Sequence, residues 1–191
     1  MIIGLGGTNG AGKDLVAEIL AQKYGYLFVG ATELFTGELQ KRGWELTRTN
    51  KAKLSAEWRR ELGMAAVVDK ALAVYRSHPE GTYKGLVVSS LRHPGEVDRI
   101  HEVGGSVIWI DAEPEVRYQR IRSANRGRSA EDDKTFEEFL ADEQREMTPE
   151  GDGATLNMLA VKERADNTLW NNFSDREQLE AELAKVIAAL Q

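Results

Sequence analysis

The 191-residue sequence contains no cysteine, which excludes disulfide bonds, thiolate metal ligands and a cysteine nucleophile. It has only three histidines, and their spacing is not that of a zinc site. No apolar run approaches the roughly 18 residues that a membrane span needs. The first residues also lack the basic and apolar regions of a secretion signal. We therefore expect a cytoplasmic protein that does not enter a membrane.

Basic residues are fewer than acidic residues in this chain. The chain has 25 Lys and Arg against 31 Asp and Glu, a net charge of -6, which makes a broad nucleic-acid-binding surface unfavourable. The hydrophobic share of 41% is typical of a globular domain with an apolar core. The composition therefore indicates one domain whose partners are small molecules, and it leaves monomer and homodimer equally open.

Short apolar runs alternate with helical patterns, as in a parallel sheet with helical crossovers. The predicted strands are Ile2–Leu5, Tyr26–Val29, Gly85–Ser89, Ser106–Ile110 and Asn167–Trp170. Ser174 with Glu177 and Thr135 with Glu138 fit the capping box that begins a helix. The predicted fold class is α/β, a single three-layer α/β/α domain around a five-stranded parallel sheet.

Two long segments interrupt the alternation of strands and helices. Residues 32–78 are helical in pattern throughout, and residues 117–149 hold a cluster of arginines. In a compact sheet protein, such long excursions usually cover a substrate instead of building the core. We expect both segments to border a binding site.

A phosphate-binding loop is predicted between the first strand and the first helix, where the sequence meets the spacing G-x-x-x-x-G-K. Glycines let backbone N–H groups point inward, the helix start adds positive potential, and Lys13 reaches the outer phosphates of a nucleotide. The alternative is a glycine-rich turn with a solvated lysine. The residues expected to bind the nucleotide are Gly7, Thr8, Asn9, Gly10, Ala11, Gly12, Lys13, Asp14 and Leu15.

The last position of this motif is unusual. Asp14 stands where Ser or Thr normally holds Mg²⁺, and because a carboxylate also binds hard cations, Asp14 is the candidate metal ligand. Many phosphate-loop enzymes place an acid near the end of the third strand, where this chain has Ser89 and Ser90. Asp111, after the fourth strand, is predicted to cap the helix that begins near Pro114.

Arginines outside the loop are candidate phosphate ligands. Arg92 follows the third strand, whose carboxyl end faces the site, and it can fork onto an acceptor phosphate. The alternative for Arg92 is a surface pair with Glu96. In the second segment we select Arg120, Arg126 and Arg128 as catalytic groups that neutralise the charge of the transferred phosphoryl. The alternative is a basic face balanced by neighbouring acids.

Several motifs in order resemble the phosphate-loop nucleotide kinases, most closely the adenylate-kinase-related and dephospho-CoA-kinase-like group. The likeness covers nearly the whole chain. Besides the loop it rests on Lys41-Arg42-Gly43, Leu46-Thr47-Arg48, Arg59 to Gly63, Ser90-Leu91-Arg92, Arg126-Gly127-Arg128, Thr135 to Phe139 and Ala165-Asp166-Asn167. It implies a core of residues 1–31, 79–116 and 150–191, an acceptor-binding insert at 32–78 and an arginine lid at 117–149.

The resemblance implies transfer of the γ-phosphoryl group of ATP, with Mg²⁺, to a phosphorylated acceptor, in the first place a nucleoside or deoxynucleoside monophosphate. It adds Arg48 and Arg59 to Arg92 as acceptor ligands and places the nucleotide base near Asn172. A Gly-Lys-Asp ending is also similar to that of phage deoxynucleoside monophosphate kinases and animal phosphomevalonate kinases, so Asp14 is compatible with kinase activity.

Two departures from the group leave alternatives open. Ser89-Ser90-Leu91-Arg92 replaces the usual Asp-Gly-x-Arg, which favours a nucleotide-binding regulator that transfers nothing. Gly30-Ala31-Thr32 lacks the acid that dephospho-CoA kinases carry after the second strand, although dephospho-CoA or another small phospho-metabolite remains the second choice of acceptor. The two arginine-bearing segments favour a kinase, because a regulator needs no second phosphate pocket.

Overall fold

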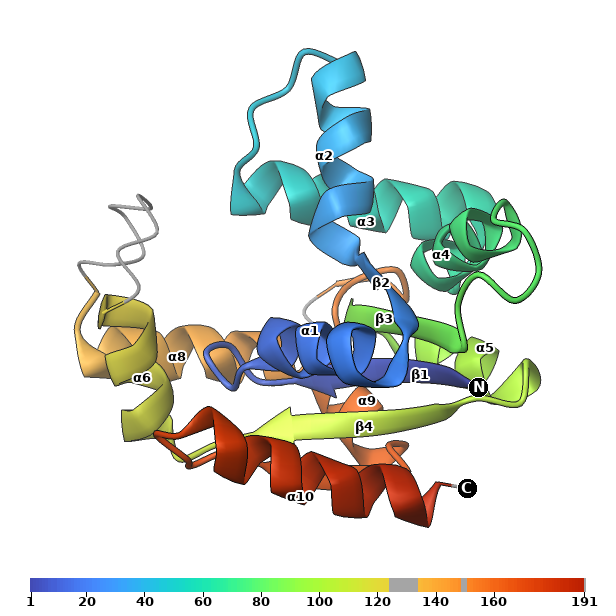
Figure 1. Ribbon diagram of the computed structural model, residues 1–191. Helices are drawn as coiled ribbons and strands as arrows, with labels where there is room; N and C mark the ends of the chain where they lie inside the picture. The colour runs from blue at the N-terminus through green and yellow to red at the C-terminus, as the bar shows by residue number, and fades with distance from the viewer. Residues whose placement is uncertain (124–133, 149–150, 191) are drawn as a thin grey trace.

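The computed structural model describes residues 1–123, 134–148 and 151–190 and has a parallel sheet at its centre (Figure 1). Its strands are β1 (Ile2–Gly7), β2 (Tyr26–Gly30), β3 (Gly85–Leu91), β4 (Ser106–Asp111) and β5 (Asn167–Trp170). They lie in the order β2-β3-β1-β4-β5, and each neighbouring pair is parallel. The prediction of a five-stranded parallel sheet is confirmed, with strand ends that differ by up to two residues.

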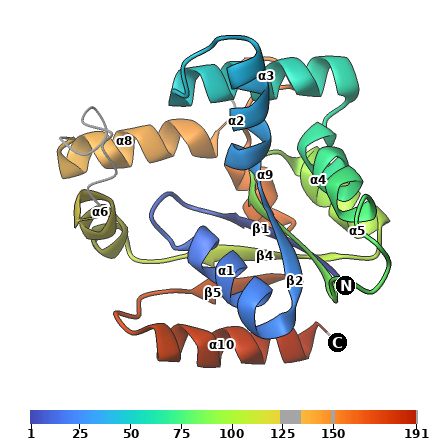
Figure 2. The ribbon, with the colours of Figure 1, turned by 45° about the horizontal axis from the view of Figure 1, so that its top comes forward.

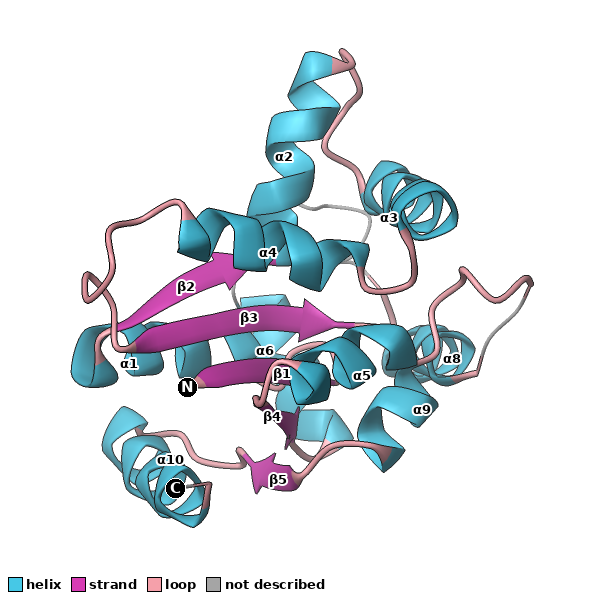
Figure 3. Cartoon of the chain, turned by 90° about the vertical axis from the view of Figure 1, so that its right-hand side faces the viewer, coloured by secondary structure: helices cyan, strands magenta, loops and turns pink. Residues whose placement is uncertain are grey.

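Helices cover both faces of the sheet (Figures 2 and 3). The helices are α1 (Lys13–Tyr24), α2 (Ala31–Lys41), α3 (Arg48–Leu62), α4 (Ala66–Arg76), α5 (Pro94–Glu102), α6 (Pro114–Ser123), α8 (Phe136–Met147), α9 (Met158–Glu163) and α10 (Arg176–Ala189). One apolar cluster joins α1 and α10 to the sheet, and a second joins α4, α5 and α9 to its other face. The three-layer α/β/α arrangement is therefore confirmed.

Side chains of different size line the two faces of the central strand. On β1, Ile3 and Leu5 are fully buried in the cluster that contains α1 and α10. Gly6 points to the opposite face, where a Cβ would lie 3.1 Å from the ring of Trp109. This alternation lets the largest side chain of β4 pack close to the strand that carries the phosphate loop.

The segment 32–78 divides into two parts. Helices α2 and α3 project from the sheet (Figure 1) and form a small core with the first two residues of α4, in which the rings of Phe35 and Trp58 are 5.1 Å apart. The rest of helix α4 packs on the sheet, because Val68, Ala71 and Leu72 are buried in the same cluster as β3.

In residues 1–123, 134–148 and 151–190, no helix combines the length and apolar character that crossing a membrane requires.

The two capping predictions have opposite outcomes. Thr135 and Glu138 form the predicted capping box, since the Thr135 hydroxyl accepts from the Glu138 amide and the Glu138 carboxylate accepts from the Thr135 amide. The prediction of a Ser174–Glu177 box is wrong. Asp175 is the N-cap of α10, and its carboxylate accepts from the Glu177 amide at 2.8 Å. An aspartate one residue later supplies a charged acceptor, which suits the positive helix start.

Candidate active site

The phosphate loop lies between the end of β1 and the start of α1, as predicted. Gly10 and Gly12 have φ angles of 81° and 95°, in the left-handed region that favours glycine. A Cβ at Gly10 would lie 2.7 Å from the Arg117 carbonyl oxygen, and one at Gly12 would lie 2.6 Å from the amide nitrogen of Asn171. Both glycines are therefore required by conformation and by close neighbours.

Lys13 lies inside this loop. Its ammonium donates to the carbonyl oxygens of Gly7 at 2.9 Å and Thr8 at 2.7 Å. The pKa of Lys13 is lowered from 10.5 to about 7, mainly by burial and also by the positive charges of Arg92 and Arg117, while Asp14 and Asp111 oppose the shift. The side chains of Arg92 and Arg117 therefore lie within electrostatic reach of Lys13, which suits the loop to a ligand with several negative charges.

We expect nucleotide binding to take up a proton between about pH 7.5 and 9. In that range Lys13 is largely neutral, and polyphosphate beside its ammonium raises its pKa back toward the ordinary value. Titration calorimetry with ADP in buffers of different ionisation enthalpy measures the uptake. It should approach one proton per ADP at pH 8.5 and shrink near pH 6, where Lys13 is already charged. Equal heats in all buffers at pH 8.5 would contradict the lowered pKa.

Asp14 meets a serine from the end of β3. The hydroxyl of Ser89, which is fully buried, donates to a carboxylate oxygen of Asp14 at 2.9 Å. Carboxylate and hydroxyl oxygens suit Mg²⁺, which usually takes one or two protein ligands and completes its shell with phosphates and waters. Among the described residues no group of three His, Asp or Glu side chains forms a metal cage. The Asp14–Ser89 pair therefore fits a Mg²⁺ ion whose remaining ligands come from the phosphates of a nucleotide and from water.

The backbone next to Ser89 is strained. Ser90 has a φ of 74°, an uncommon conformation for a residue with a side chain that costs about 1–2 kcal/mol. The register between β1 and β3 shifts here, since Leu5 pairs with Ser89 and Gly6 with Leu91. Such strain is often retained at functional sites. The irregularity lies beside the Asp14–Ser89 contact.

Arg92 and Arg59 occupy different surroundings. The side chain of Arg92 is 30% exposed and its guanidinium donates to Glu146 at 3.2 Å, while the backbone amide of Arg92 donates to Glu96. The side-chain pair of Arg92 with Glu96, the alternative left open by the sequence, is therefore not formed. Glu96 instead pairs with Arg59 at 3.0 Å, and both side chains are almost fully buried.

The burial of Arg59 corrects its predicted role as an acceptor ligand. Besides Glu96 it donates to the carbonyl oxygen of Ala154 at 3.2 Å, so its guanidinium is enclosed by protein. Because Arg59 is on α3 and Glu96 on α5, the pair ties the projecting helices to the sheet layer. The side chain of Arg48, the other acceptor ligand predicted in this segment, lies outside what the structure describes.

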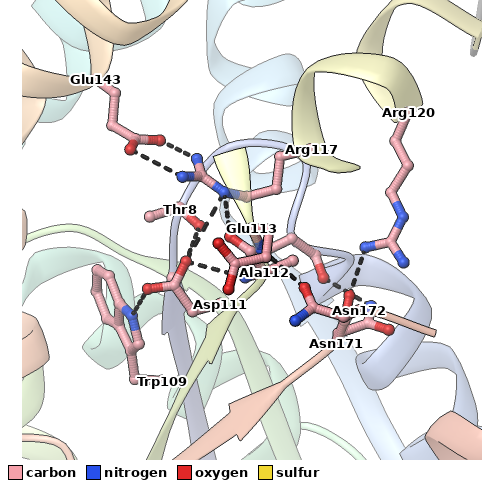
Figure 4. Close-up of polar contacts among 12 residues, drawn as sticks. Thr8, Trp109, Asp111, Ala112, Glu113, Arg117, Arg120, Glu143, Asn171 and Asn172 are labelled. Atoms are coloured by element: carbon pink, nitrogen blue, oxygen red, sulfur yellow. Dashed lines mark hydrogen bonds and ion pairs between the residues drawn. The ribbon is translucent and has the colours of Figure 1, made fainter. Parts of the chain in front are cut away.

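Arg120 also departs from its predicted role. Its guanidinium donates to the carbonyl oxygens of Asn171 at 2.8 Å and Phe173 at 2.6 Å, on the loop after β5, instead of pointing to the phosphate loop (Figure 4). Asn172 in the same loop accepts from the Glu113 amide at 2.8 Å. Arg120 therefore holds the loop near which the nucleotide base is expected. The other two predicted lid arginines, Arg126 and Arg128, lie outside the described residues.

Asp111 is a site residue that the sequence reading missed. It does not cap α6 as predicted; the carboxylate accepts from the Thr8 hydroxyl at 2.8 Å and from the Trp109 indole at 3.0 Å (Figure 4). It also accepts from the Ala112 amide and the Lys162 ammonium. Burial acts to raise the pKa of Asp111, but the hydrogen bonds from Trp109, Thr8 and Ala112 outweigh it and lower the pKa. The available signal was an acid at the carboxyl end of β4, which lies next to β1.

A cleft of about 570 Å³, open to solvent, adjoins the phosphate loop. Its walls come from the loop itself, from α6 and α8, and from the first residue of α9. The lining residues are Thr8, Asn9, Tyr118, Ile121, Lys134, Phe139, Asp142, Glu143, Glu146, Met147 and Met158. This volume includes the solvent at the mouth of the cleft, so it is not the volume of an enclosed cavity.

Known proteins share the sequence features of this chain. Residues 3–148 match the family model described as an AAA domain. UPF0200 protein TK1334 of Thermococcus kodakarensis is 31% identical, and the match covers 98% of this chain and 96% of that protein. A UPF0200 protein of Thermococcus gammatolerans is 30% identical over 93% of this chain and 89% of its own length.

Solved structures share the fold. A crystal structure of shikimate kinase from Bacteroides thetaiotaomicron has a TM-score of 0.68 at 15% identity and covers 100% of this chain and 98% of that one. The crystal structure of TT1252 from Thermus thermophilus has a TM-score of 0.53 at 26% identity, with 100% and 98% covered. The three-layer phosphate-loop kinase fold, which the resemblance implied, is therefore confirmed.

Proposed function

The chain belongs to the UPF0200 family and to the AAA domain family, and from this premise we propose that it is an ATP-dependent phosphotransferase acting on a phosphorylated small molecule. The observation that carries the proposal is the convergence of Lys13, Arg92 and the Asp14–Ser89 pair on the phosphate loop. A donor site needs the loop and its lysine. An acceptor site needs a positive charge at the same edge of the sheet, and Arg92 supplies that charge directly after β3.

In this proposal the loop binds the phosphates of ATP through its backbone N–H groups and Lys13. Arg92 binds the phosphate of the acceptor, for which a nucleoside or deoxynucleoside monophosphate is the first choice. Arg120 and Asn172 shape the loop after β5 that borders the base. Arg59 acts indirectly, by fixing the position of α3.

The Asp14 carboxylate and the Ser89 hydroxyl would hold Mg²⁺. When bound, this ion neutralises charge on the phosphoryl oxygens. In the transfer, an oxygen of the acceptor phosphate forms a bond to the γ-phosphorus while the bond to the bridging β–γ oxygen breaks, so that ADP leaves. The protein contributes alignment, positive charge from Lys13 and Arg92, and exclusion of water from the cleft.

A panel of acceptors tests the proposal. ADP release from ATP is measured with the wild-type protein for nucleoside and deoxynucleoside monophosphates, dephospho-CoA and phosphomevalonate, each against the acceptor-free rate. We expect a monophosphate to raise ADP release well above that rate. Stimulation only by dephospho-CoA or phosphomevalonate would move the acceptor to that class, and no stimulation across the panel would favour a nucleotide-binding regulator.

The control for this assay is a Lys13→Ala preparation purified in the same way. Lys13 donates to the loop carbonyls and in this proposal binds the donor phosphates, so its loss should remove the stimulated ADP release. Retained stimulation would identify a contaminating kinase or a wrong site.

A further inference from the structure

Two carboxylates of α8 each hold an arginine beside the phosphate loop. Glu143 accepts from both terminal nitrogens of Arg117, with one of these contacts at 2.9 Å (Figure 4). Glu146 accepts from Arg92 at 3.2 Å. The two acids are three residues apart, so they share one face of the helix, and both line the cleft next to the loop.

The two arginines come from different elements but act on the same lysine. Arg117 lies on α6 and Arg92 follows β3, and the charge of each lowers the pKa of Lys13. Their guanidinium groups therefore lie within electrostatic reach of the phosphate site. Glu143 and Glu146 thus neutralise cations that the phosphates of a substrate would also attract.

The two ion pairs differ in how firmly they are held. Arg117 is 3% exposed, also donates to the carbonyl oxygen of Ala112 at 2.7 Å, and lies over the ring of Phe139. Arg92 and Glu146 are 30% and 19% exposed. A partly exposed pair contributes little stability, whereas removing one partner of a buried pair is costly. The Arg92–Glu146 pair is therefore the one that an incoming anion can separate.

Resting on the proposed function, we propose that Glu146 is a specificity-determining residue, which competes with the acceptor phosphate for Arg92. A phosphate dianion attracts the guanidinium more strongly than a single carboxylate does, so it displaces Glu146, while a monoanionic acceptor does not. The pair thus reserves Arg92 for acceptors that carry a phosphate. Because Glu146 occupies Arg92 for part of the time, the pair lowers the apparent affinity for these acceptors in proportion to that fraction.

The experiment measures binding of inorganic phosphate to the ADP-loaded protein by titration calorimetry. Glu146→Gln should tighten phosphate binding by about 3- to 10-fold, because it removes the competing charge while keeping the shape of the side chain. Glu146→Gln should also reduce the difference in affinity between phosphate and acetate. Glu182→Gln on α10, where the carboxylate pairs with Lys185, removes the same net charge elsewhere and should leave phosphate binding unchanged.

A double-mutant cycle assigns the effect to Arg92. In an Arg92→Gln background, Glu146→Gln should no longer tighten phosphate binding. Thermal unfolding of Glu146→Gln should stay close to that of the wild type, since the pair is partly exposed. Phosphate affinity in Glu146→Gln that equals or falls below that of the Glu182→Gln control would overturn the inference. Failure of the wild-type protein to bind ADP would instead overturn the proposed function.

Discussion

We expect Asp14→Ser to lower kcat/KM for the proposed phosphoryl transfer by about 10²- to 10³-fold, and we expect adding Ser89→Asp to restore most of the loss. The reason is that the Asp14 carboxylate and the Ser89 hydroxyl are 2.9 Å apart at the end of β3. Exchanging the two residue types keeps one carboxylate and one hydroxyl in the same place. The exchanged pair also matches the more usual arrangement, a hydroxyl on the phosphate loop and an acid at the strand end.

The single variants serve as the controls for this exchange. Ser89→Asp alone places two carboxylates side by side, and their repulsion should lower both activity and the free energy of unfolding. A readout independent of turnover is the affinity for ADP with and without Mg²⁺. Asp14→Ser should reduce the gain that Mg²⁺ confers, and the double variant should recover it. A double variant no better than the worse single one would show that the two residues do not form one metal site.

We expect Glu96→Ala to lower the free energy of unfolding by about 3–5 kcal/mol, the cost typical of breaking a buried ion pair. The substitution leaves the Arg59 guanidinium, 2% exposed, without its carboxylate. Arg59 already has one buried nitrogen, Nε, that no hydrogen bond satisfies among the described residues. Glu96 also accepts from the backbone amides of Arg92 and His93, so the start of α5 loses half of its capping box, although the His93 side chain still caps the Gly95 amide. Urea denaturation measures the change.

The matched control lies on the same helix. Glu102 pairs with Arg99 and is 63% exposed, so Glu102→Ala should cost no more than about 1 kcal/mol. Combining Arg59→Met with Glu96→Ala should recover part of the stability, because no unpaired charge then remains buried. Equal losses for Glu96→Ala and Glu102→Ala would contradict the burial of the Arg59–Glu96 pair.

Features that depend on neighbours along the chain could be read from the amino-acid sequence. The alternation of apolar runs located every strand of the sheet, and the glycine spacing before Lys13 located the phosphate loop. The capping box at Thr135 follows the same logic, since its partners are three residues apart. The Ser174 box failed on a local competition, because Asp175 offered a better acceptor one residue later.

Features that depend on which charges meet were decided by the tertiary structure. Arg59 pairs with Glu96, which is 37 residues away in the sequence, and Arg92 pairs with Glu146, which is 54 residues away. Asp111 and Thr8, which share a hydrogen bond, are 103 residues apart. An arginine has the same helical pattern whether it faces a phosphate or a buried carboxylate, so the sequence pattern does not distinguish these roles. The local pattern thus identified the loop and the sheet, while the packing of α3, α6 and α8 assigned the partners of the arginines, because these contacts form only when distant segments fold together.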